Sequence, residues 1–173
     1  MAEKIPDLID PLVLAERRSM LSGTINVAAF ERLSELITEQ NGVVAVDVVF
    51  AKQGKRAVVS GNIKGTLQIE CQSCLEAMPW PLDIAFKLGV VSSMQEADKL
   101  EIDCEPLVFE GEKISLNALI EDEILLTLPD YPKHGYECIK QKSSKASDYD
   151  KQNNQAKVEN PFSVLAKLKN TGE

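Results

Sequence analysis

Residues 64–74 have the sequence KGTLQIECQSC, an alternating segment that ends in a Cys-x-x-Cys pair. Because successive side chains of a β-strand point to opposite faces, Leu67, Ile69 and Cys71 share one face of the strand. Cys71 and Cys74 therefore lie where this strand ends. No other part of the sequence places two thiols so close together. Any metal or redox chemistry is expected at this end of the strand.

Two further strands flank this segment in the sequence. Residues 43–51 (VVAVDVVFA) are rich in β-branched residues, and a turn at residues 53–55 (QGK) leads into the strand that runs from Arg56 to the cysteines. Residues 79–81 (PWP) are expected to break the chain, after which residues 82–91 resume the alternation. Three long strands with short connections predict an antiparallel meander.

Weaker signals extend this predicted sheet. Residues 21–25 and 106–110 are candidates for short strands, which gives a sheet of about four to six strands. Gly61 and Gly65 fall inside the strand that leads to the cysteines. Glycine within a long strand predicts bulges or a sharply curved sheet.

Two helices are predicted to pack against the sheet. Asn26 is a suitable N-cap for a helix over residues 27–40, and Ser115 for a helix over residues 116–128 that Pro129 closes. In residues 121–123 (EDE), successive side chains diverge around the helix, so we expect a solvated acidic face rather than a catalytic or metal site. The apolar faces comprise Phe30, Leu33 and Ile37 in the first helix, and Leu116, Leu119, Ile120, Ile124 and Leu128 in the second.

The end of the chain differs in composition from the rest. Residues 140–159 hold Ser, Lys, Asp, Asn and Gln with almost no apolar residue, which predicts a flexible linker. A short amphipathic helix is predicted in residues 160–173, beginning with an N-cap and a proline. Such a helix either docks on its own domain or engages a partner, and its spacing fits both. Its start and its apolar side are formed by Asn160, Pro161, Phe162, Leu165 and Leu168.

The length and composition fit a globular protein with appendages. A chain of 173 residues can bury a core without disulfides, and 44% hydrophobic residues with 27% charged residues exclude global disorder. We therefore predict an α+β fold. It comprises one domain over residues 1–139, with a curved antiparallel β-meander and two main helices, followed by the linker and the tethered C-terminal helix.

The charge of the chain bears on its partners. A formal net charge of −8 argues against an extended phosphate-binding surface, because nucleic-acid binding usually requires a basic patch. Lys52, Lys55 and Arg56 form a local basic group at the tip of the predicted hairpin, where they could contact RNA. The alternative is that they are ordinary solvated turn residues, and no aromatic side chain for base stacking lies among them.

The N-terminus and the cysteines indicate the compartment. Residues 1–11 lack a positive region followed by an apolar run, and no stretch reaches the roughly 20 apolar residues that span a bilayer. We therefore expect a soluble cytoplasmic protein without membrane contact. Four cysteines in such a chain are expected to be reduced or metal-bound rather than paired in disulfides.

A zinc site is one interpretation of these cysteines. Cys71 and Cys74 could supply one half of a tetrahedral Zn²⁺ site, and His134 with Cys138 the other half. The alternative is two reduced thiols near a turn and a histidine in a loop. A thioredoxin-like role is disfavoured because no helix signal follows Cys74. The sequence also lacks a nucleophile elbow and a phosphate-binding glycine loop, so an enzyme is not expected.

Three segments of the sequence form a recognisable set: the strand ending at residues 71–75 (CQSCL), the helix and proline at residues 116–129 (LNALIEDEILLTLP), and residues 160–168 (NPFSVLAKL). Together they resemble the YceD family of bacterial large ribosomal RNA subunit accumulation proteins. They occur in family order and span nearly the whole chain.

The resemblance implies a role in the synthesis, processing or accumulation of large-subunit (23S) ribosomal RNA, and no catalytic residues. The implied partners are that RNA, a ribosomal protein or another assembly factor. We expect no small-molecule substrate, and no cofactor other than the structural zinc that the cysteines and His134 could hold. A second class of function remains an alternative: a zinc- or thiol-dependent enzyme or sensor centred on Cys71 and Cys74.

Overall fold

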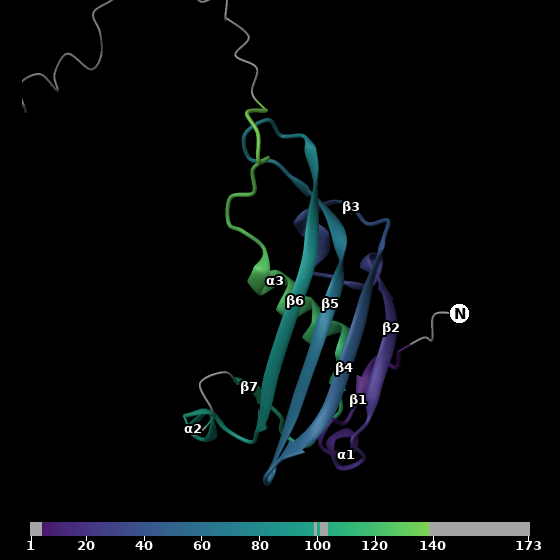
Figure 1. The fold of residues 1–173 in the computed structure, drawn as a ribbon, viewed down its shortest axis with the longest axis vertical. Coiled ribbons are helices and arrows are strands. Elements are labelled where there is room, and N and C mark those ends of the chain that lie inside the picture. The colour runs from purple at the N-terminus through teal and green to yellow at the C-terminus, as the bar shows by residue number, and fades with distance from the viewer. Residues whose placement is uncertain (1–4, 99, 101–103, 139–173) are drawn as a thin grey trace, which may run out of the picture. The chain divides into compact units, whose positions relative to one another are not determined.

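The three long strands predicted from the sequence form the centre of a six-stranded sheet in a computed structural model of the protein (Figure 1). They are β4 (Val43–Gln53), β5 (Arg56–Glu70) and β6 (Ala77–Val91), and each pairs antiparallel with the next. The structure describes residues 5–98, 100 and 104–138. The predicted meander is therefore present, within a mixed α+β fold.

Shorter strands complete the sheet at its edges. Strand β2 (Met20–Asn26) pairs antiparallel with β4, and β3 (Ile37–Glu39) pairs with the far end of β5. Strand β7 (Glu105–Val108) pairs with β6 in the parallel direction. The other strands are β1 (Leu8–Ile9) and β8 (Ile114–Ser115), which pair with each other. The α-helices of the described residues are α1 (Pro11–Glu16), α2 (Met94–Ala97) and α3 (Leu116–Thr127).

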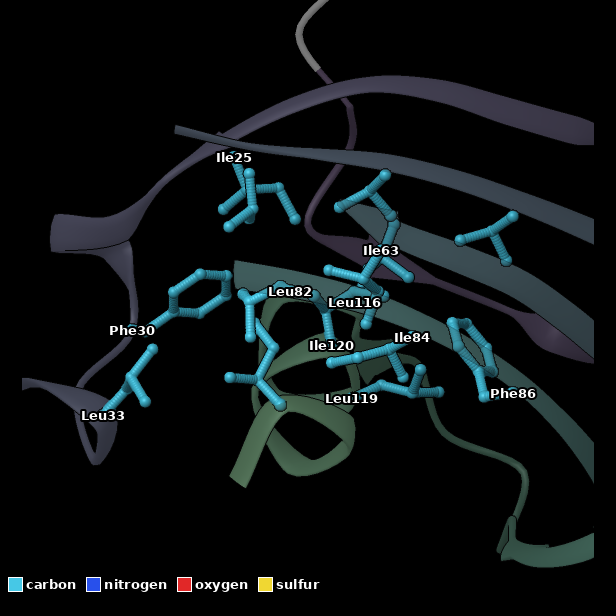
Figure 2. Close-up of a cluster of buried hydrophobic side chains, with 14 of the residues drawn as sticks. Ile25, Phe30, Leu33, Ile63, Leu82, Ile84, Phe86, Leu116, Leu119 and Ile120 are labelled. Carbon is cyan, nitrogen blue, oxygen red and sulfur yellow. The ribbon is translucent and has the colours of Figure 1, made fainter. Parts of the chain in front are cut away.

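Helix α3 packs its apolar side against one face of the sheet. Ser115 caps the helix as predicted, with its hydroxyl accepting a hydrogen bond from the N–H of Ala118 at 3.1 Å. The alternating residues of β6 supply the opposing side of the core. Figure 2 shows this cluster, in which Leu116, Leu119 and Ile120 lie against Leu82, Ile84 and Phe86, and all six are buried.

The prediction of a helix over residues 27–40 is wrong. Two short 3₁₀ turns, η1 (Val27–Ala29) and η2 (Leu33–Glu35), lie there, followed by β3. Asn26 does cap the first turn, and Phe30, Leu33 and Ile37 are buried as predicted. Tertiary contacts replace the helical hydrogen bonds, because the N–H of Leu33 donates to a carboxylate of α3 and Ile37 pairs with β5.

The predicted break at residues 79–81 is also wrong. Strand β6 continues through both prolines, with Pro79 opposite Gln68 and Pro81 opposite Thr66. Within the described residues, β7 reaches β6 only at residues 88–91, so the prolines lie where β6 is an edge strand. Proline is tolerated there because its missing N–H faces no partner strand.

The glycines of β5 do not cause bulges. The pairing of β5 with β6 runs through Gly61 and Gly65 without a shift of register, and its pairing with β4 runs through Gly61 in the same way. A Cβ atom at Gly61 would lie 2.6 Å from the ring of Phe86 and 2.6 Å from the carbonyl oxygen of Asp47. The glycine therefore makes room for an aromatic ring on the neighbouring strand.

The acidic residues of α3 depart most from the prediction. Only Asp122 faces solvent, whereas Glu121 is 5% and Glu123 is 9% exposed. Glu123 follows Leu116 by seven residues and Ile120 by three, so it lies on the apolar stripe rather than beside it. The prediction of one solvated acidic face is therefore wrong for two of the three residues.

The described helices include none that is both long and apolar enough to span a bilayer. The residues up to Cys138 form one compact unit. The predicted linker at residues 140–159 and the predicted helix at residues 160–173 lie outside the described residues.

Candidate metal centre

The turn between β5 and β6 presents the two sulfurs of the Cys-x-x-Cys pair. The N–H of Cys71 donates to the carbonyl of Glu76 at 3.0 Å, and the N–H of Leu75 donates to the carbonyl of Cys71 at 2.8 Å. Leu75 adopts a left-handed conformation with φ 61°, which closes the turn. The N–H of Ser73 points at the Cys71 sulfur, 3.4 Å away. This backbone therefore stabilises negative charge on the Cys71 sulfur.

The segment after α3 returns to this turn. The N–H of Gln72 donates to the carbonyl of Pro132 at 2.8 Å, which fixes the returning chain beside the turn. His134 and Cys138 follow within six residues of that contact. Residues separated by 60 or more positions in the chain thereby meet at one end of the sheet.

The four predicted ligands form one cluster. The Sγ atoms of Cys71 and Cys138 lie 3.8 Å apart, and the Sγ atom of Cys74 lies 3.5 Å from Nδ1 of His134. All four donor atoms lie within 4.8 Å of one another. Tetrahedral Zn²⁺ with its usual bond lengths places two sulfurs about 3.8 Å apart, and a sulfur and a nitrogen about 3.6 Å apart. The Cys71–Cys138 and Cys74–His134 separations match these two values.

The distances exclude a disulfide and favour a closed site. All four cysteines of the chain are free thiols, and 3.8 Å is far longer than the about 2.05 Å of an S–S bond. Three thiols and one imidazole fill all four positions of a tetrahedral centre. Catalytic zinc sites keep one position for water or substrate, whereas structural sites do not. The donor set is therefore that of a structural site.

The electrostatics of the cluster favour a cation. Burial raises the pKa of the Cys71 thiol, but hydrogen bonds from the backbone of Cys74, Ser73 and His134 outweigh burial and lower this pKa to about 5. Burial and the neighbouring thiols Cys74 and Cys71 raise the pKa of Cys138 to about 11. The pocket thus holds one negative charge readily and resists a second. A divalent cation would remove that resistance by pairing with both thiolates.

The other predicted contact residues do not join this cluster. Lys52, Lys55 and Arg56 lie at the β4–β5 turn, at the opposite end of β5, about 45 Å from the cysteines by strand length. The ammonium of Lys52 pairs with Glu16 of α1 at 2.9 Å, so this cation is already partly neutralised. The C-terminal residues Asn160, Pro161, Phe162, Leu165 and Leu168 lie outside the described residues.

The comparisons with known proteins agree with the motifs. The family described as "Large ribosomal RNA subunit accumulation protein YceD" matches residues 59–169. The chain belongs to the YceD family. Its match covers the four clustered residues and runs through residues 160–169 near the end of the chain.

A curated relative extends the YceD match over nearly the full chain. It is a Haemophilus influenzae protein named large ribosomal RNA subunit accumulation protein YceD. It is 32% identical over 168 residues, which cover 96% of this chain and 97% of that protein. No solved structure matches the chain significantly. The resemblance predicted from the sequence is thereby confirmed.

The sequence patterns did not predict one acidic groove of this protein. It lies beside α3, where Glu123 lines a groove together with Glu105 of β7. The spacing of Glu123 within the apolar stripe was the available signal. The contribution of β7 was not predictable, because its parallel pairing with β6 leaves no local pattern.

Proposed function

We propose that this protein is a non-catalytic, cytoplasmic ribosome-biogenesis factor that promotes the accumulation of large-subunit ribosomal RNA. Membership of the YceD family carries this proposal, and the name of the Haemophilus relative states that activity for the relative. The protein would act through the RNA itself, a ribosomal protein or another assembly factor. The closed donor set of the cysteine cluster supports a role without catalysis.

Depletion in the source organism tests this function. We expect cells without the protein to lose large-subunit RNA relative to small-subunit RNA, and a plasmid copy of the full chain to restore the ratio. The ratio is measured by gel electrophoresis of total RNA and by sucrose-gradient profiles of the subunits. Unchanged subunit ratios after depletion would overturn the proposal.

We further propose that Cys71, Cys74, His134 and Cys138 hold a structural Zn²⁺. Such an ion would fasten the returning segment to the β5–β6 turn, where the described residues show one backbone hydrogen bond, from Gln72 to Pro132. The match of the sulfur and nitrogen separations to tetrahedral Zn²⁺ carries this proposal. Bound zinc contributes directly to folding, because the unfolded chain offers no preformed site.

Metal analysis of the purified full-length protein tests the zinc site. We expect about one Zn²⁺ per chain by atomic emission, and loss of that metal in Cys71→Ser, Cys74→Ser and Cys138→Ser. Cys104→Ser is the matched control, since Cys104 lies outside the cluster, and it should retain the metal. Zinc-free protein, or equal metal loss in the control, would overturn the site.

The same variants separate a structural ion from a zinc- or thiol-dependent enzyme or sensor. A structural ion predicts that cluster variants lose thermal stability together with the metal, and that RNA accumulation falls only as folded protein falls. If Cys71→Ser leaves the protein stable but abolishes its cellular function, the thiol acts chemically. A zinc-free protein whose Cys71→Ser variant keeps full function would exclude both roles.

A further inference from the structure

A groove of about 650 Å³ lies between α3, β7 and the adjoining end of β6. Its apolar lining comes from all three elements and includes Leu88, Leu107, Leu119 and Leu126. Leu119 belongs to the core, but Leu126 is 73% exposed although it is a large apolar side chain. A groove that joins the core to an exposed leucine offers apolar surface to a partner.

Acidic side chains line the same groove, and they differ in their partners. Asp122 pairs with Arg32, whose Nη1 atom lies 2.6 Å from its carboxylate. Within the part of the chain that the structure describes, the carboxylates of Glu105 and Glu123 take part in no hydrogen bond or ion pair. Their oxygens open onto the groove, because no fully buried side-chain oxygen of the described residues lacks a partner. Glu123 is nevertheless nine-tenths buried. The groove therefore contains an unpartnered carboxylate at its apolar wall.

An unpartnered carboxylate in such a place favours binding of a cation. Buried carboxylates are normally paired or hydrogen-bonded, because loss of hydration is unfavourable for a charge. Burial, followed by the repulsion of Glu105 and Asp122, raises the pKa of Glu123 to about 6. A lysine or arginine of a partner would donate hydrogen bonds to these carboxylates in place of solvent and would offset their repulsion. The apolar lining calls at the same time for apolar side chains next to that cation.

We propose that this groove is the docking site for a basic amphipathic segment of a partner protein, with a lysine or arginine placed between Glu105 and Glu123 and apolar side chains against Leu107, Leu119 and Leu126. A segment of this kind presents cations and apolar anchors on one face, as helices that bind grooves do. The net charge of −8 would attract such a partner over a distance.

The choice of a protein rather than RNA follows from the charges. Carboxylates in the groove repel phosphates, and Arg32, the basic residue of the lining, is already paired with Glu121 and Asp122. The identity of the partner rests on the proposed function. A factor that works on ribosomal RNA meets RNA-binding proteins, and these carry excess lysine and arginine because they neutralise phosphates.

Binding of synthetic peptides to the full-length protein tests the chemistry of the groove. The probe is an amphipathic leucine–lysine peptide of about four helical turns, and the control is a leucine–glutamate peptide of the same pattern. We expect the lysine peptide to shift the backbone amide NMR signals of Glu105, Leu107 and residues 119–126. The glutamate peptide should leave those signals unchanged.

Variants locate the site by titration with the same lysine peptide. Glu105→Lys and Leu126→Ser change exposed residues, and Glu123→Gln removes the buried charge while keeping the shape of the side chain. We expect Glu105→Lys and Glu123→Gln each to weaken binding by about tenfold, and Leu126→Ser by a smaller factor. Asp83→Lys on the opposite face of the sheet makes the same charge reversal as Glu105→Lys and should leave affinity unchanged.

Three outcomes of the peptide titrations would overturn the proposal. They are binding of the lysine peptide that Glu105→Lys, Glu123→Gln and Leu126→Ser leave unchanged, equal binding of the acidic peptide, or absence of binding. Deletion of residues 160–173 tests a different occupant: if that deletion shifts the groove signals, the partner assignment fails. In depleted cells, a Glu105→Lys chain that fully restores large-subunit RNA would refute the docking role of the groove but not the proposed function of the protein. Unchanged RNA after depletion refutes the proposed function instead.

Discussion

Two carboxylates on α3, only two positions apart, lie in opposite surroundings. Glu121 accepts a hydrogen bond from the N–H of Leu33 at 2.8 Å and another from Nε of Arg32 at 3.2 Å. Glu123, on the other side of the helix, has no such donor among the described residues and lines the groove instead. Both are almost fully buried. Burial alone therefore does not tell what a carboxylate does.

The two carboxylates differ in whether the described chain supplies hydrogen-bond donors to them. For Glu121 the same chain supplies them, and the carboxylate joins α3 to η2, replacing the helical hydrogen bonds that residues 27–40 do not form. For Glu123 the described chain supplies none, and its carboxylate oxygens are open to the solvent of the groove, since no fully buried side-chain oxygen of the described residues lacks a partner. We interpret the first carboxylate as part of the fold and the second as part of a recognition surface.

The largest expected effect is that of Glu121→Ala. It removes both hydrogen bonds and leaves the N–H of Leu33 buried without an acceptor, so we expect a loss of about 3 kcal/mol in the free energy of unfolding. Urea denaturation followed by circular dichroism measures it. Glu121→Gln keeps one carbonyl oxygen as an acceptor and should lose clearly less. Equal stability of Glu121→Ala and the natural chain would remove the contrast between the two residues.

Glu123→Gln should have the opposite sign. The pKa of Glu123 is raised from 4.5 to about 6, so its stabilising contribution is fully present below pH 4.5 and is lost as the pH rises through 6. Glutamine is neutral at every pH, so the Glu123→Gln variant does not lose stability as the pH rises. We expect the variant to be more stable than the natural chain by about 1–2 kcal/mol near pH 7.5, and the difference to vanish near pH 4.5.

Thermal unfolding across this pH range measures the difference. Glu110→Gln replaces an exposed glutamate by the same change and should show no such pH-dependent gain. A Glu123→Gln chain that is less stable than the natural one at pH 7.5 would show that the buried carboxylate has a donor in solution.

Asp122→Asn should have the smallest effect. Its pair with Arg32 is half exposed on both sides, and exposed ion pairs contribute little. We expect no change that a urea titration resolves. A clear loss of stability would mean that Asp122 acts through Arg32 on Glu121, and the three residues would then form one network rather than two surroundings.

Local patterns account for what could be predicted. Strands β4 and β5 were predicted from the alternation of residues 43–51 and 64–71, and α3 from the cap at Ser115. These predictions succeeded because a few neighbouring residues suffice to show the period of a strand or helix. The spacing of Cys71, Cys74, His134 and Cys138 predicted the candidate site. The prolines of β6 led to the wrong prediction of a chain break, because they are compatible with a strand only where β6 lies at an edge of the sheet.

The sequence by itself determined the long strands, the helix α3, the four candidate ligands and the family. Each of these depends on residue types at short or family-specific spacing. Tertiary structure alone decided that the two halves of the cysteine cluster meet, since 60 positions separate Cys74 from His134. It also decided the surroundings of Glu121 and Glu123. The partners of a buried charge come from distant segments, and no local period encodes them.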